Sequence, residues 1–230
     1  MGPFGTALDL ILSGDPVLLG IIGLSLRVTL TAVLVACLIG LPLGALIALM
    51  RFPGRGVVVV FFNAMMGLPP VVAGLVVYMM LSRAGPLGPL NLLFSPAAMI
   101  IAQTLLILPI VVSLTRSVVE DLWAEYEEQL RSLGSSRVRA IPTLLWDGRF
   151  SLMTGILAGF GRASAEVGAV LIVGGNIAGH TRTMTTAITL ETARGNLGLA
   201  VALGIVLLAI TLTLTAGAYG IGEWGRRRAG

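Results

Sequence analysis

The stretch LSLRVTLTAVLVACLIGLPLGALIALM, residues Leu24–Met50, is an almost unbroken run of apolar side chains. A helix needs roughly 20 such residues to cross about 30 Å of hydrocarbon, so this run is long enough to span a membrane. Four further runs follow, each bounded by glycine, proline or arginine, at Val57–Leu81, Leu92–Thr115, Leu152–Val173 and Leu197–Tyr219. The sequence therefore predicts an all-α integral membrane protein with about five transmembrane helices.

The composition of the whole chain fits the same class of protein. Of its 230 residues, 56% are apolar and only 11% are charged, whereas a soluble domain usually carries about 25% charged residues. The chain contains no lysine, so its fifteen positive charges are all arginine. The basic character of the chain reflects loops at a membrane surface rather than affinity for nucleic acid. We therefore expect membrane lipid among its partners, and no nucleic acid.

The first twenty residues are predicted to lie apart from the spans. A short apolar segment at Ala7–Leu12 is broken by SGDP, residues Ser13–Pro16, and is interpreted as an amphipathic helix at the membrane interface. It lacks the basic start of a signal peptide, so we expect it to be retained. The predicted organisation is an interfacial segment at residues 1–20, a transmembrane domain at residues 21–222 and a basic cytoplasmic tail at residues 223–230.

Arginine is distributed unevenly between the two sets of loops that five spans create. With the N-terminus outside, the outer loops hold only Arg83, Arg182 and Arg194. The segments on the other side hold Arg51, Arg55, Arg116, Arg131, Arg137, Arg139, Arg149, Arg226, Arg227 and Arg228. Because short loops rich in arginine stay in the cytoplasm, we expect the C-terminus to be cytoplasmic.

Much of the remaining charge lies in one cytoplasmic loop, at about residues 117–149. Its sequence AEYEEQLRSLGSSRVRAIPTLLW, Ala124–Trp146, follows a helical pattern in which apolar residues recur at spacings of four and three, at Leu122, Tyr126, Leu130 and Leu133. Gly134 suits the left-handed residue that closes a helix. Ser135 or Ser136 is predicted to cap a second short helix, which Pro142 must interrupt or restart. Such a pair of helices is either a knob that another protein receives or a solvated loop packed on its own membrane domain.

The run EEQLRSLG, Glu127–Gly134, resembles the EAA loop of type I ABC importer permeases, with Glu128 and Gly134 in matching positions. Trp146 and Asp147 depart from the Leu-Pro that ends the motif. The resemblance implies a bacterial cytoplasmic (inner) membrane protein whose coupling helix docks in a cleft of a cytoplasmic ATPase. It assigns ATPase coupling to Glu127, Glu128, Gln129, Leu130, Leu133 and Gly134.

The absence of lysine supports this division of labour. A Walker-type phosphate-binding loop requires a lysine to reach the phosphates, and the chain has none. We therefore expect no enzymatic activity and no cofactor in this chain, with ATP and Mg bound by the partner ATPase.

Polar residues within the apolar runs are candidates for a membrane pathway. Arg162 and Glu166 lie four residues apart, hence on one helical face, and each is costly at membrane depth unless paired or turned toward protein or water. This spacing fits an ion pair that fixes packing, or contact with substrate. Prolines interrupt the second span at Pro69 and Pro70 and the third at Pro109, and such breaks tend to line a cavity. The nearby amides, Asn63 and Gln103, are predicted to face the bundle interior.

The outer segment VGGNIAGHTRTMTTAITLETARG, Val173–Gly195, offers hydroxyl groups and guanidinium groups that can hydrogen-bond an oxyanion. Thr185 and Thr186 are assigned to the pathway. The alternative is a polar loop that contacts a substrate-binding protein, through Asn176, His180, Thr181, Arg182 and Thr183. No cysteine or second histidine accompanies His180, so we expect no metal site.

Three features resemble the tungstate subgroup of oxyanion permeases: MGLPPVVAGLVVYMMLSRAGPLG at Met66–Gly88, the outer segment, and the five-span layout. This resemblance implies a homodimer that imports tungstate together with an ABC ATPase dimer and an extracytoplasmic oxyanion-binding protein. Molybdate or sulfate import by the same family is the alternative substrate assignment. A secondary anion carrier driven by an ion gradient is the alternative class, although the sequence shows no inverted repeat.

Overall fold

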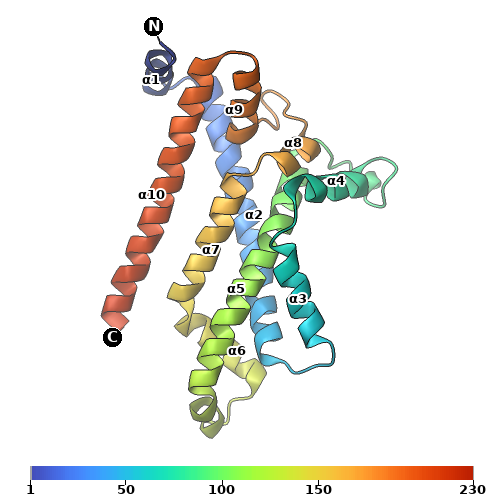
Figure 1. Ribbon diagram of the computed structural model, residues 1–230, viewed down its shortest axis with the longest axis vertical. Coiled ribbons are helices and arrows are strands. Elements are labelled where there is room, and N and C mark those ends of the chain that lie inside the picture. The colour runs from blue at the N-terminus through green and yellow to red at the C-terminus, as the bar shows by residue number, and fades with distance from the viewer. Residues whose placement is uncertain (1, 230) are drawn as a thin grey trace.

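The computed structural model describes the backbone of residues 2–229, and the side chains within that range except for residue 218 and residues 221–229. The described chain is helical, without a strand in residues 2–229 (Figure 1). Its elements are α1 (Pro3–Ser13), α2 (Pro16–Leu49), α3 (Arg55–Met65), α4 (Pro70–Leu81), the 3-10 turn η1 (Gly88–Leu90), α5 (Pro96–Ser132), α6 (Arg137–Asp147), α7 (Arg149–Ser164), α8 (Gly168–Gly174), α9 (Met184–Ala193) and α10 (Leu197–Ala229).

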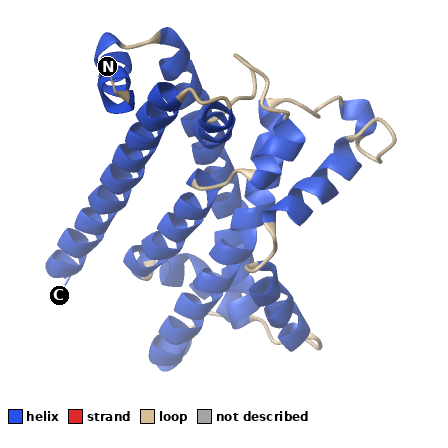
Figure 2. Ribbon diagram, turned by 45° about the horizontal axis from the view of Figure 1, so that its top comes forward, coloured by secondary structure: helices blue, strands red, loops and turns tan. Residues whose placement is uncertain are grey.

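The predicted spans are present, two of them as bent pairs of helices. Within the described residues, α2, α5 and α10 are each long and apolar enough to cross a membrane. The pairs α3 with α4 and α7 with α8 reach the same length together but bend by 106° and 58°; Figure 2 shows a loop between the helices of each pair. The fold therefore has three spans, or five when each bent pair counts as one, and the predicted all-α class is confirmed.

The first span begins earlier than the predicted Leu24. α2 starts at Pro16, where proline suits the first helical position, and the Asp15 carboxylate accepts a hydrogen bond of 2.9 Å from the Leu18 amide. The SGDP segment thus separates α1 from α2 and also starts the long helix.

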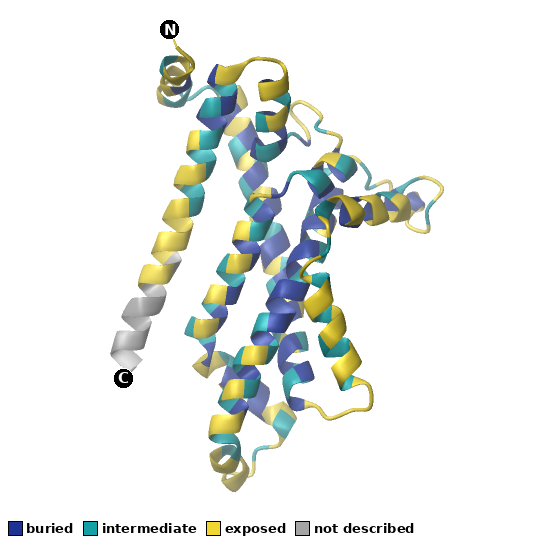
Figure 3. Ribbon diagram, in the orientation of Figure 1, coloured by how far each residue is buried: buried dark blue, intermediate teal, exposed yellow. Residues whose placement is uncertain are grey.

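Small residues allow two helices to close on α5, which runs through the most buried part of the molecule (Figure 3). A Cβ added at Gly44 of α2 would lie 2.7 Å from the Val112 carbonyl oxygen of α5, and one at Gly159 of α7 would lie 2.7 Å from Cγ2 of Ile107. Each glycine has a partner one turn away, Gly40 and Gly155, so both contacts are close crossings of the small-xxx-small kind.

Proline breaks one span but not the other. α3 ends at Met65 and α4 restarts with Pro70 in its first turn, as predicted. α5, by contrast, runs through Pro109 without interruption, which corrects the predicted break in the third span. Pro109 is buried, and its neighbours in α5 pack on two sides, against Gly40 of α2 and Gly159 of α7. This packing supports the helix across the one missing amide.

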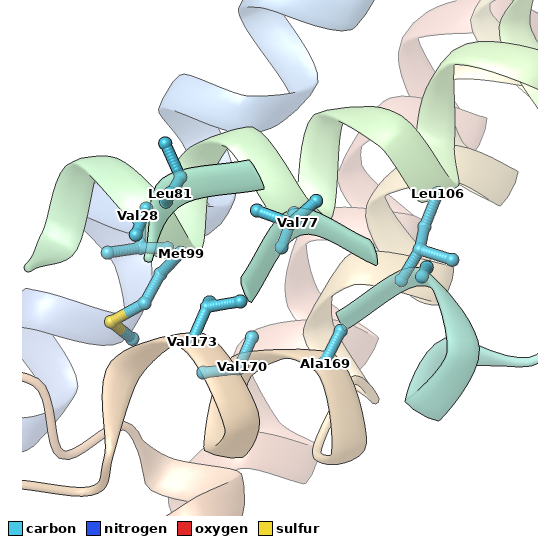
Figure 4. Close-up of a cluster of buried hydrophobic side chains, with 11 residues drawn as sticks. Val28, Val77, Leu81, Met99, Leu106, Ala169, Val170 and Val173 are labelled. Atoms are coloured by element: carbon cyan, nitrogen blue, oxygen red, sulfur yellow. The ribbon is translucent and has the colours of Figure 1, made fainter. Parts of the chain in front are cut away.

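The bent pairs pack against each other beside α5. Val77 of α4, Met99 and Leu106 of α5 and Val173 of α8 belong to one buried apolar cluster (Figure 4). A Cβ on Gly74 would lie 2.7 Å from Cα of Ala169, so α4 and α8 approach almost to backbone contact. Next to the break between α7 and α8, a Cβ on Gly168 would lie 3.0 Å from a methyl of Val71 in α4, so this break is held against α4.

α1 is a helix, as predicted, and packs on the start of α10. Ala7 is fully buried in a cluster with residues of α2, α9 and α10. Its other face exposes Phe4, Leu8 and Leu12. An exposed apolar face of this kind is typical of a helix that lies on a membrane surface.

Candidate coupling site and membrane pathway

The end of α5 and the short α6 form a knob at the end of the molecule opposite α1 and α9 (Figure 1). Gly134 has φ of 75° and joins the two helices. Its amide donates to the Arg131 carbonyl at 2.9 Å, and the Ser135 amide donates to the Leu130 carbonyl at 2.9 Å. This is the Schellman arrangement that satisfies the last carbonyls of a helix. The left-handed glycine predicted from the sequence is confirmed.

Two details of the predicted knob are wrong. Its first helix is not a separate short element but the continuation of the third span, because α5 is unbroken from Pro96 to Ser132. Pro142 does not interrupt the second helix, which runs from Arg137 to Asp147 after a cap by the Ser136 hydroxyl. Pro142 is exposed, so water can satisfy the carbonyl one turn earlier that loses its partner.

The knob has one packed face and one free face. Tyr126 and Leu130 pack against a buried cluster formed by α2, α5 and α6. Glu127 pairs with Arg131 at 2.6 Å and with Arg137 at 3.5 Å. Among the predicted coupling residues, the exposed ones are Glu128, Gln129, Leu133 and Gly134. These four are the residues that a docking protein could reach.

The knob also exposes large apolar side chains, of which the sequence analysis assigned only Leu133 to coupling. Leu133 is 83% exposed, Trp146 68% and Val138 56%. The Arg149 guanidinium lies 4.7 Å from the centre of the Trp146 ring, within the range of a cation–π contact. The pKa of the Tyr126 phenol is raised above its ordinary value, because the phenol lies beside the negative charge of Glu125 and donates a hydrogen bond to that carboxylate. The knob therefore presents exposed apolar side chains as well as carboxylates and arginines.

The predicted Arg162–Glu166 ion pair is absent from the described side chains. α7 ends at Ser164, so the two residues do not share a helical face. Glu166 is buried and its Oε1 accepts a hydrogen bond of 2.9 Å from the Ala169 amide, at the start of α8. Arg162 is partly exposed in the last turn of α7. The Glu166 carboxylate therefore accepts a hydrogen bond from the start of α8, whereas the sequence spacing predicted a salt bridge with Arg162.

A small polar cavity lies among α2, α5, α7, α9 and α10. Its volume of about 20 Å³ is room for about one water molecule. Gln103 lines it and donates to the Ala163 carbonyl at 3.2 Å, while the side-chain oxygen of this buried glutamine has no described hydrogen-bond partner. Thr185 lines it too, and its hydroxyl donates to the Glu166 carbonyl at 2.7 Å. The remaining polar lining comes from Ser25, Thr29, Ser164, Thr183 and Thr211.

The structure thus brings together part of the predicted pathway set. Gln103, Thr185 and Glu166 meet at or beside this cavity, whereas Asn63 is exposed on α3, away from the predicted bundle interior. Asn63 lies on a helix face that the rest of the single chain leaves open. Thr186 is buried and forms a capping box with Thr183 at the start of α9, so both hydroxyls are used by the backbone.

The outer segment is more ordered than a simple exposed loop. The Thr181 hydroxyl is fully buried, donates to the Gly174 carbonyl and accepts from the Ile177 amide. Asn176 has φ of 50° and its amide donates to the Thr186 carbonyl at 3.4 Å. Of the residues predicted to contact a binding protein, Thr181 and Thr183 are buried, Asn176 and Arg182 are partly buried, and His180 is exposed. His180 and Arg182 line an outer groove of about 570 Å³ between this segment and α2.

Sequence reasoning missed two charged residues here. Glu191 of α9 is buried, accepts a hydrogen bond of 3.0 Å from the Asn196 side chain, and lies 3.3 Å from Arg194 and 4.0 Å from Arg182. It ties the outer segment to the turn before α10. Arg27 is the one charge in α2, and it is exposed on that helix. Its position inside an apolar run was a visible signal, because an arginine within a span usually marks a functional site.

The sequence matches the family described as "Binding-protein-dependent transport system inner membrane component" over residues 40–223. It is 39% identical to the tungstate uptake system permease protein TupB of Peptoclostridium acidaminophilum, covering 96% of both chains. It is 41% identical to a probable anion ABC transporter permease protein of Haloferax volcanii, over 86% of this chain and 88% of the relative. It is 30% identical to a sulfate transport system permease protein, CysT of Salmonella typhimurium, over 82% of this chain and 72% of the relative. The chain therefore belongs to the family of binding-protein-dependent transport system inner membrane components.

Proposed function

We propose that this protein is the permease subunit of an ABC importer that carries tungstate across the inner membrane. The observation that carries the proposal is the match of nearly the whole chain to a tungstate uptake permease. The helical spans supply the membrane domain, and the knob of α5 and α6 supplies a surface on which an ATPase can dock. ATP and Mg bind to that partner in this scheme, because the chain has no lysine for a Walker-type loop.

The proposed assembly contains two copies of this chain, a dimer of cytoplasmic ATPases and an extracytoplasmic oxyanion-binding protein. Support for a second copy comes from α3 and α4. They expose Val57, Val60, Val71, Leu75 and Met79, and the backbone between them is not helical. Non-helical backbone at membrane depth is tolerated where protein or a water-filled cavity covers it, and a twofold partner would provide that cover.

The polar cavity supports a closed pathway in this arrangement. A volume of about 20 Å³ is far below what a tetrahedral oxyanion needs, so helices around Gln103 and Thr185 must separate before substrate passes. The cavity offers hydroxyl and amide groups, which bind an anion without covalent chemistry. Access would alternate between the two faces of the membrane.

The distribution of arginine between the two ends of the molecule supports a cytoplasmic location for the knob and the C-terminus. The α2–α3 loop, α6 and the start of α7 lie at the knob end of the molecule (Figure 1), and they contain Arg51, Arg137, Arg139 and Arg149. The positive-inside rule places this end in the cytoplasm. The tail arginines, Arg226 to Arg228, lie outside the described side chains.

Uptake of labelled tungstate by cells that express the permease with its own ATPase and binding protein tests the substrate. Hydroxyl and amide donors cannot easily separate tungstate from molybdate, since both are divalent tetrahedral oxyanions of similar size. Selection between them must therefore occur earlier, at the binding protein. We expect molybdate to compete weakly in the complete system, and a swapped binding protein to change selectivity more than Thr185→Ala or Thr186→Ala. If sulfate or molybdate outcompeted tungstate at equal concentration, that anion would be the substrate.

The rival assignment is a secondary carrier driven by an ion gradient. Proteoliposomes that hold the complete complex separate the two classes. We expect uptake to require ATP on the side of the ATPase and to persist when ionophores collapse ion gradients. Uptake by the permease alone, driven by an imposed gradient, would establish the carrier instead.

A further inference from the structure

The C-terminal end of α2 is capped by two arginines from other helices. The last carbonyls of a helix lack amide partners within that helix, and they form the negative end of its dipole. Arg55 donates through Nε to the Ile47 carbonyl at 2.8 Å and through a terminal nitrogen to Ala48 at 3.3 Å. Arg137 donates to the Leu49 carbonyl at 3.2 Å. The last three carbonyls of α2 are therefore held from outside.

The same two guanidinium groups also bind α5. Arg55 pairs with Glu120, which also pairs with Arg116 of its own helix. Arg137 lies 3.5 Å from Glu127 and 5.8 Å from the centre of the Trp123 ring. The α5 partners, Glu120, Trp123 and Glu127, recur at spacings of three and four, so they form one stripe that faces the end of α2.

Each of the two arginines stands at the start of a helix. Arg55 is the first residue of α3, and Arg137 is the first residue of α6. Both line an open recess of about 310 Å³ between α2 and the extension of α5. The last residues of α2, the first residues of α3 and α6, and the Glu120–Glu127 stretch of α5 therefore converge on two side chains. Beneath them, Leu49, Ala140 and Leu144 pack in a buried cluster, which ties α6 to α2 through apolar contact as well.

We propose that Arg55 and Arg137 form a two-arginine clamp that passes displacement of α6 to the inner ends of α2 and α3. This rests on the proposed function, in which an ATPase moves the knob. A guanidinium suits the task because its planar fork can donate to a carbonyl and a carboxylate at once. A hydrogen bond weakens steeply beyond about 3.5 Å, so an α6 movement of about 1 Å must either draw Leu49 along or break the contact.

The clamp differs from a static helix cap in what its loss would do. A static cap would affect stability, and with it uptake and ATP hydrolysis in equal proportion. Loss of the clamp should instead lower the amount of substrate taken up per ATP hydrolysed. Without Arg137, the ATPase still docks on the exposed face of the knob and hydrolyses ATP, but its movement no longer reaches α2.

The test is to reconstitute the permease with its ATPase and binding protein in proteoliposomes and to measure tungstate uptake and ATP hydrolysis together. For Arg137→Ala we expect hydrolysis to persist while uptake per ATP falls about fivefold or more, the range of ordinary coupling between sites. Arg51→Ala is the matched control, since Arg51 lines the same recess but lies in the loop between α2 and α3, outside the knob, and makes no ion pair among the described side chains. It should behave as wild type.

Two further variants separate the contacts. Glu127→Gln removes the ionic partner but leaves the Arg137–Leu49 hydrogen bond, so we expect a smaller loss. Arg137→Lys keeps the charge but not the fork, and should also lose coupling while it folds as wild type. Unchanged uptake per ATP in both Arg137 variants would overturn the clamp, and so would a parallel fall of uptake and hydrolysis. A wild-type complex without ATP-driven uptake would instead overturn the proposed function and the clamp with it.

Discussion

The Thr185 hydroxyl donates a hydrogen bond of 2.7 Å to the backbone carbonyl of Glu166. The Glu166 side chain in turn accepts a bond from the Ala169 amide at the start of α8. α9 is therefore tied to the break between α7 and α8, beside the polar cavity that Gln103 lines. In the proposed importer, an element on the outer side of the molecule is thus joined directly to the point where a span bends.

Glu166→Ala should destabilise this break. The Ala169 amide would lose its acceptor, and loss of a side-chain cap costs about 1 kcal/mol, rising to about 2 kcal/mol. Glu166→Gln keeps an acceptor oxygen and should cost less. Thermal unfolding of the purified protein in detergent measures both. Ser95→Ala is the comparison: Ser95 caps α5 through a longer bond of 3.4 Å, so its loss should lower the melting temperature less. Equal melting temperatures for Glu166→Ala and wild type would rule out the capping role.

Gly44→Ala should weaken the contact between α2 and α5. The new Cβ would lie 2.7 Å from a backbone oxygen of α5, which cannot move aside as a side chain can. Overpacking of this kind costs about 1–3 kcal/mol. Gly23→Ala in the same helix is the control, because nothing lies within 4 Å of its Cβ position. We expect a lower melting temperature for Gly44→Ala alone. Equal stability of the two variants would mean that α2 and α5 do not cross this closely.

Gly134→Asp should leave the protein inserted but abolish coupled transport. Nothing in this chain lies within 4 Å of the added Cβ, so the intramolecular cost is the left-handed φ of 75°. Gly195→Asp is a matched control, with φ of 78° and equally open space at the other end of the molecule. Membrane fractionation and uptake assays should show both variants inserted and only Gly134→Asp inactive. Wild-type uptake by Gly134→Asp would contradict the coupling role of this bend.

A reporter fused after Gly230 should lie in the cytoplasm, and one inserted between α4 and η1 should lie outside. Gly88 itself is buried against the Ser82 carbonyl, so an insertion after the exposed Pro86 disturbs the turn less. Alkaline phosphatase and fluorescent-protein fusions read the two sides. The opposite labelling would reverse the orientation that the arginine distribution predicts.

The sequence predicted the spans and the knob because each has a strong local signal. An apolar run of about 20 residues or more indicates a helix that spans a membrane. Gly134 follows an amphipathic pattern and takes the left-handed conformation, as such a glycine commonly does. The polar outer segment was also visible, although its burial was not.

The errors arose where tertiary contacts override local pattern. Spacing placed Arg162 and Glu166 on one face, but α7 ends between them and the carboxylate serves the next helix. Pro109 was expected to break α5, yet the helix continues through it where its neighbours pack against α2 and α7. The clamp residues could not be found by pattern, since Arg55 and Glu120 are 65 positions apart in the chain.

The central claim is that the exposed face of the knob docks an ATPase. Cys37 is the only cysteine in the sequence, so Cys37→Ala provides a background for placing single thiols. Leu133→Cys and Leu12→Cys put a thiol-reactive photocrosslinker at two positions that are both 83% exposed, one on the knob and one on α1. After illumination of the assembled complex, we expect Leu133→Cys to crosslink to the ATPase and Leu12→Cys not to. Absence of an ATPase adduct at Leu133→Cys, or equal adducts at both positions, would contradict the account.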